Sequence, residues 1–580
     1  MKREENYMKL LVFLILTLFG VVGFWKSQGF DLGKSDSSTL NLTINNQIKS
    51  FDPAIAFNDD SLRVVGQSLE TLYQYHYLKR PYEVIPALAD GMPRVSKDGK
   101  TYTIKIKKGI RYKSSLKELQ NRTVKAQDFI NQIKRLAFAP LSSTGAWLFK
   151  GKLKGFDEFG EVVGNDYLKM LSTSMEGAQV LDDYTFRLVL NRAEPNMLYF
   201  LSMIFTTPVP VELIHKYKND LSNVLVGTGA FYLKESSEDL LVFEKNENFR
   251  EEYYPSSGDR YANTQSLLKS SLERLPFLNR VVFHVMSDDE KKWEAFLNGE
   301  LDILGVPKKF LATITEPRSS LKREMDRKGI KIKHFSSISS RWLGFNMQDP
   351  LIGKNLNLRK AIAHCIDFEK YLTIMSNNTN LKANSIYNPS IPGYNPSNQL
   401  SYQYNLEKAK EYLELAGFRP GELTITYTTR GKQDIHFIEA EFIKSQLGKI
   451  GINVKVETLS FSEFLKKGRA GKLQFFTDNW IYDYPDAENI IQLLIGANSP
   501  GVNKSAYRHP VVESLYAELA KTSVKEKRFE LMEKVEKQVD LDLPWVMLMF
   551  ESSYILHHSS IKNFRRSYFI RNHLKYLKKE

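Results

Sequence analysis

The stretch VSKDGKTYTIKIKKGI, residues 95–110, places a turn directly before a strand. Apolar and polar side chains alternate through residues 102–106, as they do in a strand with one buried face. Asp98-Gly99 is a dipeptide of tight hairpins, so this strand is expected to have an antiparallel partner. Residues 184–190 (YTFRLVL) alternate in the same way. The pattern predicts an antiparallel sheet in this region of the chain.

A different arrangement is expected in the C-terminal half. Apolar residues with helical spacing at 438–450 lie between alternating stretches at 423–427 and 452–456. Gly451 stands where a helix commonly ends in the left-handed conformation. A strand, a helix and a second strand in this order form a βαβ unit, whose strands are parallel. The chain is therefore predicted to be mixed α/β.

The composition is that of a large globular protein. The 580 residues suggest three or four structural units of about 150 residues each. The single cysteine, Cys365, excludes a disulfide framework and thiolate-based metal sites, and it is expected to be a small buried side chain. The formal net charge is +14, but the basic residues are spread along the chain without an aromatic-interleaved motif. No nucleic-acid partner is expected.

Sequence patterns typical of catalysis are absent. The chain has no His-Glu-x-x-His, no Gly-x-Ser-x-Gly, no phosphate-binding loop and no dinucleotide fingerprint. The adjacent histidines His557 and His558 would point to opposite faces of a strand, which makes them poor joint metal ligands. We therefore expect no enzyme activity, no cofactor and no metal site.

The N-terminus is typical of an exported protein. Residues 10–25 (LLVFLILTLFGVVGFW) are uncharged and follow Lys2, Arg3 and Lys9, as in a signal peptide. The apolar run is shorter than the roughly 20 residues that span a bilayer, although a retained membrane anchor and a buried core helix stay open. No cysteine follows the run, which excludes a lipoprotein. Residues 26–38 are polar and are expected to form a flexible linker.

Several segments, in their order along the chain, resemble the extracytoplasmic solute-binding proteins of peptide ABC transporters, the oligopeptide/dipeptide-binding family (solute-binding family 5). The segment at 95–110 is similar to a specific signature of this family. The other matching segments are SFDPA at 50–54, IPALAD at 85–90, GTGAF at 227–231, LGFN at 343–346 and WIYDYPD at 480–486. The resemblance covers about residues 40 to 565.

The resemblance implies an α/β fold of the periplasmic-binding-protein type (type II, cluster C). Such a fold is a bilobal Venus flytrap with an extra third lobe, in which helices flank mixed sheets. Residues 1–25 would be a signal peptide or anchor and 26–38 a linker. Lobe I would be assembled from three separate segments, 39–70, 206–280 and 526–580, the last of which includes a basic tail. Lobe II would span 71–205 and lobe III 281–525.

Asp483 is the strongest candidate for ligand contact. A carboxylate that follows a strand with aromatic residues suits a cationic amine, and the resemblance implies that Asp483 takes the α-amino group of a peptide. The alternative is a structural cap or a salt bridge between lobes. Strand alternation puts Ile481 and Asp483 on one side and Trp480 and Tyr482 on the other. Trp480, Ile481, Tyr482 and the neighbouring Asn479 are further candidates.

The opposite wall of the cleft is expected at Phe57, Asn58 and Asp59, which are chosen by their location in the family and not by side-chain type. The chain departs from the best-known oligopeptide binders at Thr477, where those proteins place an arginine. The inherited partner for a peptide carboxylate is therefore missing. Arg469 is the basic candidate retained nearby, with Lys467 and Arg430 as other possibilities.

The function implied by the resemblance is a receptor. As a monomer in the periplasm, it would capture peptides between its lobes and deliver them to the permease subunits of an ABC transporter in the inner membrane. A non-peptide ligand (a metal chelate, haem, a sugar or glutathione) or a transporter-independent sensor on the same fold stays open. An exported enzyme is a third possibility, but it has no positioned nucleophile or metal in its favour.

Overall fold

The structure is a computed structural model that describes residues 37–311, 314 and 320–580. The expected signal segment at 1–25 and residues 26–36 of the expected linker lie outside the described residues. Among those described, no helix has the length and apolar character needed to cross a membrane.

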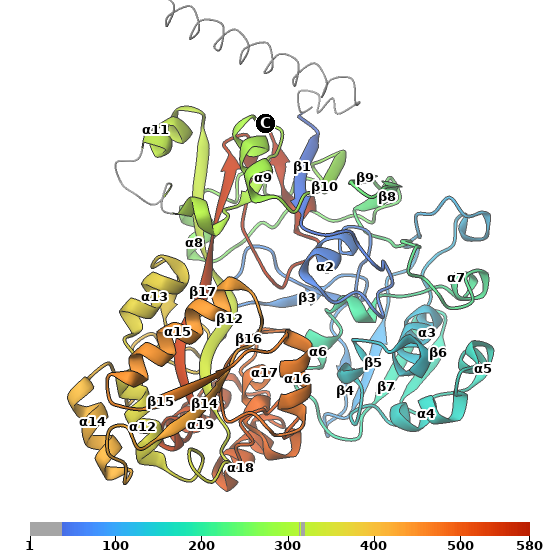
Figure 1. The fold of residues 1–580 in the computed structure, drawn as a ribbon. Coiled ribbons are helices and arrows are strands. Elements are labelled where there is room, and N and C mark those ends of the chain that lie inside the picture. Colours follow the sequence, from blue (N-terminus) through green and yellow to red (C-terminus); the bar gives the residue numbers. More distant parts are fainter. Residues whose placement is uncertain (1–36, 312–313, 315–319) are drawn as a thin grey trace, which may run out of the picture.

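Lobe I, as we name it here, is built around a four-stranded sheet in the order β1-β10-β9-β8 (Figure 1). β1 and β10 are parallel, and the other pairs are antiparallel. The helices and strands of this body are β1 (Thr39–Ile44), α2 (Asp59–Val65), β2 (Tyr73–Tyr75), β3 (Val84–Pro86), β8 (Phe231–Ser236), β9 (Leu240–Lys245), α8 (Arg260–Thr264), β10 (Arg280–Val285), α9 (Asp289–Leu297), β11 (Ile303–Gly305), α11 (Ser320–Arg327), β18 (Ile561–Lys562) and β19 (Lys578–Lys579).

Lobe II contains the antiparallel sheet that the sequence predicts, in the order β4-β5-β7-β6. β5 pairs with β7 over its whole length, and Gly99 adopts a φ of +69° in the turn that precedes β5. The apolar face of the sheet packs on α3, where Phe129 stacks on Phe186. The elements are β4 (Arg94–Val95), β5 (Thr101–Lys105), α3 (Ala126–Ala137), α4 (Phe156–Val163), α5 (Tyr167–Ser172), β6 (Ala178–Asp182), β7 (Thr185–Val189), α6 (Met197–Phe200) and α7 (Val211–Lys216).

Lobe III contains the predicted βαβ unit. β14 and β15 are parallel, α15 lies between them in the chain, and Gly451 has a φ of +77° after the helix. The elements are α12 (Leu356–Cys365), α13 (Phe368–Ser376), β13 (Leu381–Lys382), α14 (Leu406–Leu415), β14 (Thr424–Thr428), α15 (Asp434–Gly448), β15 (Asn453–Glu457), α16 (Phe461–Arg469), β16 (Phe475–Ile481), α17 (Glu488–Ile491), α18 (Pro510–Leu519) and α19 (Lys525–Asp542).

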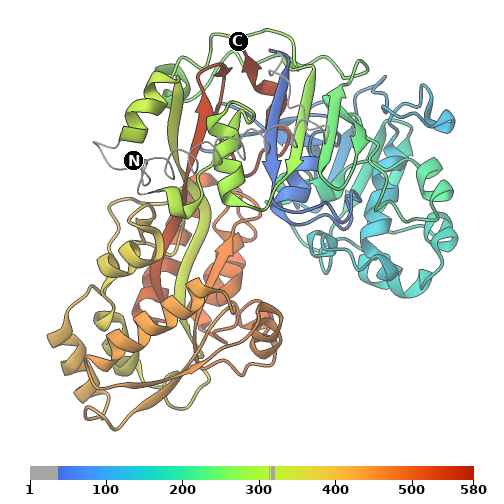
Figure 2. The same cartoon turned by 45° about the horizontal axis from the view of Figure 1, so that its top comes forward.

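Two long strands join lobe I to lobe III. β12 (Ile330–Phe345) and β17 (Trp545–His558) are antiparallel and belong to the sheet β11-β17-β12-β16-β14-β15. One end of β17 pairs with β11 of lobe I, and the other end of β12 pairs with β16 of lobe III. The register between β12 and β17 shifts between Ser336 and Ser340. Figure 2 shows both strands running from the upper body into the lower one. The irregularity marks the place where this ribbon can bend.

Lobe I is attached to lobe II by buried contacts. Asp52 and Arg135 form an ion pair at 2.5 Å, and both side chains are fully buried. Removing one partner of such a pair commonly costs about 3–5 kcal/mol, because the other charge is left uncompensated. Gly227 lies so close to the chain at Ser68 that a Cβ there would be 1.9 Å from the Ser68 carbonyl oxygen. Gly227, the first glycine of the GTGAF segment, therefore allows its backbone to approach that of Ser68 closely.

Three details refine the expectations from sequence. Cys365 is buried and its thiol donates a hydrogen bond to the Gln446 carbonyl at 2.8 Å, while burial raises its pKa to about 12. The expected boundary between residues 280 and 281 falls inside β10, which pairs with β1 and β9. The expected basic tail is folded, because Lys575 is buried and pairs with Glu252 at 2.6 Å. The exact limits of the lobes stay a prediction.

Candidate ligand-binding site

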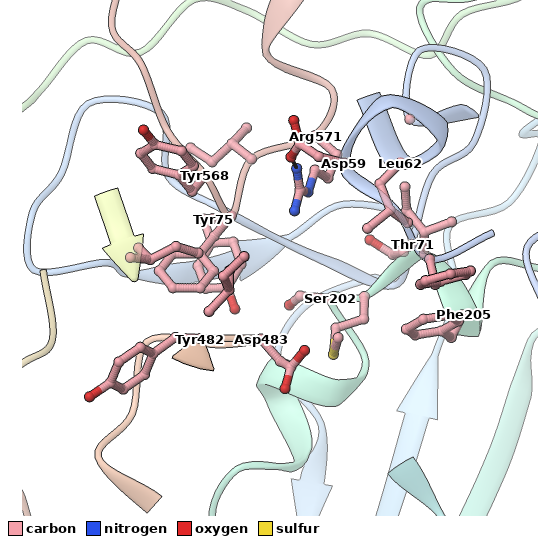
Figure 3. Close-up of a pocket in the computed structure, with 18 of the residues that line it drawn as sticks. Asp59, Leu62, Thr71, Tyr75, Ser202, Phe205, Tyr482, Asp483, Tyr568 and Arg571 are labelled. Carbon is pink, nitrogen blue, oxygen red and sulfur yellow. Dashed lines mark hydrogen bonds and ion pairs between the residues drawn. The ribbon is translucent and has the colours of Figure 1, made fainter. Parts of the chain in front are cut away.

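A cavity of about 610 Å³ lies where the three lobes meet. This volume is within the usual range of small-ligand sites. Figure 3 shows side chains reaching into it from several elements. Its walls come from six separate stretches of the chain, which lie within residues 57–75, 144–147, 202–205, 337–338, 481–483 and 568–572.

Asp483 lies on the lobe III wall, two residues beyond the end of β16. Its side chain is open to the cavity and forms no ion pair with any described residue. Partial desolvation by the walls of the cavity raises the pKa of Asp483 to about 6, against the opposing effects of a hydrogen bond from Asn489 and the charge of Arg571. The site thus holds a carboxyl without a cationic partner.

Asn489, which is fully buried in α17, holds Asp483 in place. Its side-chain amide donates to Asp483 Oδ2 at 3.1 Å, and its Oδ1 accepts from the Asp483 backbone N–H at 3.1 Å. The same oxygen accepts from Trp480 Nε1 at 2.8 Å. Asn489 was not among the residues expected from sequence, because a single Asn in an apolar stretch gives no signal of this role.

The other candidates of this segment divide between the cavity and the protein interior. Ile481, Tyr482 and Asp483 line the cavity, whereas Asn479 and Trp480 do not. Ile481 and Asp483 are exposed and Tyr482 is buried, in agreement with the predicted alternation. The Tyr482 backbone N–H donates to the carbonyl of Ile338, inside the irregular part of β12, at 3.0 Å. Their contacts with a ligand stay predictions.

The lobe I wall begins at the N-terminus of α2. Phe57, Asn58 and Asp59 all line the cavity, as expected from their location in the family. Phe57 is 66% exposed, and Asn58 caps the helix by accepting the Ser61 N–H at 2.8 Å. Asp59 forms an ion pair with Arg571. Burial alone would raise the pKa of Asp59, but Arg571 and the other arginines nearby lower it to about 2.

None of the basic candidates proposed from the sequence lines the cavity. Arg469 is exposed at the end of α16 and does not line the cavity. Arg430 pairs with Asp478 at 3.1 Å, and Lys467 pairs with Glu457. The arginine that lines the cavity is Arg571, in the segment 526–580 that was expected to complete lobe I and to end in a basic tail. Its position at the cavity was not predicted.

Aromatic side chains form much of the remaining wall. Trp147 and Phe205 reach the cavity from lobe II, and Tyr75, Tyr568 and Phe569 from lobe I. Tyr75 packs on Phe569 with ring centroids 5.9 Å apart. Flat apolar surfaces of this kind accept side chains of different shapes. Among the residues that the structure describes, no group of three or more His, Cys, Asp or Glu is placed to hold a metal ion.

Comparisons with known proteins agree with this architecture. The family model "Bacterial extracellular solute-binding proteins, family 5 Middle" matches residues 83–501. The dipeptide-binding protein DppE of Bacillus subtilis (strain 168) is 24% identical over 92% of this chain and 90% of its own length. Heme-binding protein A of Haemophilus influenzae is 21% identical over 90% of this chain and 88% of its own.

A solved structure shows the same fold. The periplasmic binding protein DppA from Helicobacter pylori, described as ABC transporter-associated and in complex with peptide STSA, superposes with a TM-score of 0.68. It is 24% identical, and the match covers 93% of this chain and 98% of that one. The α/β periplasmic-binding-protein fold expected from the sequence is confirmed. Because the family model matches more than half of the chain, this protein belongs to the bacterial extracellular solute-binding proteins of family 5.

Proposed function

We propose that this protein captures a peptide in the cavity between its lobes and delivers it to the permease of an ABC transporter. The observation that carries the proposal is the Asp483 carboxyl, which is open to the cavity, held from behind by Asn489 and not paired with a cation among the described residues. A peptide α-amino group is the cation that would complete this site. Relatives named as dipeptide-binding proteins support the same ligand class.

The arrangement of the walls supports capture by closure. Asp483 belongs to lobe III and Asp59 to lobe I, and the two lobes are joined by the ribbon of β12 and β17. A ligand that contacts both walls binds the closed form more tightly than the open one and so shifts the protein toward closure. In this role the protein acts outside the cytoplasmic membrane as a monomer, and the permease recognises the closed form.

A second ligand class has one observation in its favour. The aromatic residues Tyr75, Trp147 and Tyr568 would also suit a flat apolar molecule, and one relative is named for haem. Native mass spectrometry of the purified protein separates the two ligand classes. A series of co-purified peptide masses is the expected result. A single non-peptide mass would contradict the proposal.

A variant tests the role of Asp483 directly. Asp483→Asn is expected to weaken binding of a free-amine peptide by about 10- to 100-fold, as for the loss of one charged hydrogen bond, and to leave the N-acetylated peptide almost unaffected. Isothermal titration calorimetry with both peptides measures the difference. Asp239→Asn, in the exposed turn between β8 and β9, is the matched control. Equal losses for the two peptides would remove Asp483 from the amine site.

A further inference from the structure

Three arginines gather at the lobe I end of the cavity. Arg571 lines the cavity, and its charge acts together with those of Arg63 and Arg566 on the same neighbours, including Asp59. On the lobe I wall, the carboxylates that face this cluster are Asp59, which pairs with Arg571, and Asp60, which lies 3.8 Å from Arg63. Three guanidinium groups against two carboxylates leave a surplus of positive charge on this wall.

The position of Arg571 is fixed by the end of α2. The Gln67 side-chain amide donates to the Arg571 carbonyl at 2.8 Å and to the Arg63 carbonyl at 2.6 Å. Gly66 allows the close approach, because a Cβ at this position would lie 2.9 Å from Arg571 Cβ. These contacts hold the backbone of Arg571 against a rigid helix, as a binding residue requires.

The cluster has hydrogen-bonding capacity that the described residues do not use. The Arg571 side chain donates to Asp59 through Nη1 only. Arg566 Nε is buried and has no hydrogen-bond partner among the described residues. A guanidinium offers five N–H donors, and a buried donor without an acceptor is unfavourable. The cluster is therefore short of acceptors as well as of negative charge.

Arg571 faces Asp483 from the opposite wall. Figure 3 shows Arg571 on the upper side of the cavity and Asp483 on the lower side. They form no ion pair with each other, yet they are close enough for the charge of Arg571 to lower the pKa of Asp483. The cavity volume of about 610 Å³ is that of a small-ligand site, which suits a short peptide between the two walls.

We propose that Arg571, supported by Arg566 and Arg63, binds the carboxylate of a short peptide whose amino group lies at Asp483. This inference rests on the proposed function and specifies its ligand: a zwitterion of two or three residues held at both ends. Long peptides and peptides with a blocked C-terminus fit less well, because their chain would place an uncharged group beside the surplus guanidinium.

Calorimetry with three short ligands tests the proposal: Ala-Phe, its C-terminal amide, and Ala-Glu amide, which carries a carboxylate only on its side chain. The native protein is expected to bind Ala-Phe about 10- to 100-fold more tightly than Ala-Phe amide. Arg571→Gln is expected to abolish this preference by weakening Ala-Phe alone. Arg469→Gln, a change of an exposed arginine outside the cavity, is the matched control and leaves the preference intact.

Two further variants distinguish a local effect at Arg571 from a loss of folding. Arg571→Lys keeps a positive charge and is expected to restore some of the preference. Asp59→Asn removes the carboxylate that pairs with Arg571, so it is expected to tighten the binding of Ala-Phe more than that of Ala-Phe amide. If Ala-Glu amide binds as tightly as Ala-Phe, the cluster accepts a side-chain carboxylate and the terminal assignment is wrong.

The outcomes separate this inference from the function on which it rests. If Arg571→Gln weakens Ala-Phe and its amide equally, the carboxylate subsite is overturned and peptide binding stands. The same conclusion follows if the native protein binds only peptides of five or more residues. If no peptide of any length binds, the proposed function fails together with the inference.

Discussion

Tyr484 of lobe III packs edge to face on Phe200 of lobe II, with ring centroids 5.4 Å apart. Tyr484 is only 1% exposed, and it also stacks on Trp147 and Tyr199. It is the residue directly after Asp483. The contact between these two lobes is therefore one peptide bond away from the carboxyl that we assign to the ligand's amine.

Replacing Tyr484 by alanine is expected to weaken peptide binding by about 10- to 100-fold. The substitution removes a buried aromatic contact between lobes II and III, which stabilises the closed form relative to an open form with separated lobes. Small-angle X-ray scattering measures the effect as a smaller decrease in radius of gyration when peptide is added. Tyr253→Ala, at a half-exposed tyrosine of lobe I, is the control and should bind and compact normally. Normal compaction of the Tyr484 variant would show that the contact does not contribute to closure.

The raised pKa of Asp483 predicts that affinity depends on pH. The ionised carboxyl binds an ammonium group, and the pKa is about 6 without ligand. The contribution of Asp483 to the affinity is therefore expected to be constant above pH 7 and to fall as the pH drops through 6, by about tenfold at pH 5. Calorimetry between pH 5 and 8 measures this profile.

The Asp483→Asn variant is the control for that profile. Glu194 of lobe II also titrates in this range, because burial and the charge of Glu488 in lobe III raise its pKa to about 7. Protonation of Glu194 removes a repulsion between lobes, so affinity in this variant should stay level or rise as the pH falls. A fall as large as in the native protein would show that Asp483 is not the titrating group.

Replacing Asn489 is expected to change the pH at which half of the affinity is lost. Asn489→Asp places a second carboxylate 3.1 Å from Asp483, and like charges disfavour ionisation of both. The pH at which affinity is half lost is expected to move upward by about one unit or more. Asn489→Ala removes the hydrogen bond that lowers the pKa of Asp483 but adds no charge, so it should weaken binding and move the midpoint upward by less than Asn489→Asp does. An unchanged midpoint in Asn489→Asp would contradict the contact between the two side chains.

Two glycines give opposite predictions for stability. Gly227→Ala forces a Cβ to within 1.9 Å of a backbone oxygen that cannot move away, and a loss of several degrees in Tm or failure to fold is expected. Gly448→Ala meets no atom within 4 Å on the exposed side of α15. It is expected to stabilise the protein by about 0.5–1 kcal/mol, because alanine favours the helix. Thermal unfolding of both variants measures the contrast.

Local patterns were enough to predict most of the fold. The hairpin before β5, the antiparallel strands β5 and β7 and the parallel β14–β15 pair follow from side-chain alternation and from turn residues, which act over a few residues. The wall segments 57–59 and 481–483 were found through the family resemblance. The local pattern does not identify which segment of the chain lies opposite each of these segments across the cavity.

Arg571 illustrates that limit. In the sequence it belongs to a basic C-terminal stretch, and nothing within a few residues distinguishes it from solvated arginines. Its role depends on Gly66 and Gln67, which are about 500 positions away in the chain. Arg469 was chosen because it is near Asp483 in sequence, but α16 directs it to the surface. Only the folded arrangement distinguishes these two arginines.

The ion pair between Asp59 and Arg571 joins residues 512 positions apart. Contacts between such distant regions of a chain form late, because closing long loops costs entropy before the contact is gained. A chain whose C-terminal segment is not yet in place, or one in which only lobe II has folded, therefore has no complete cavity. Ligand binding would therefore require that the whole molecule has folded, so that only completely folded molecules could deliver a ligand.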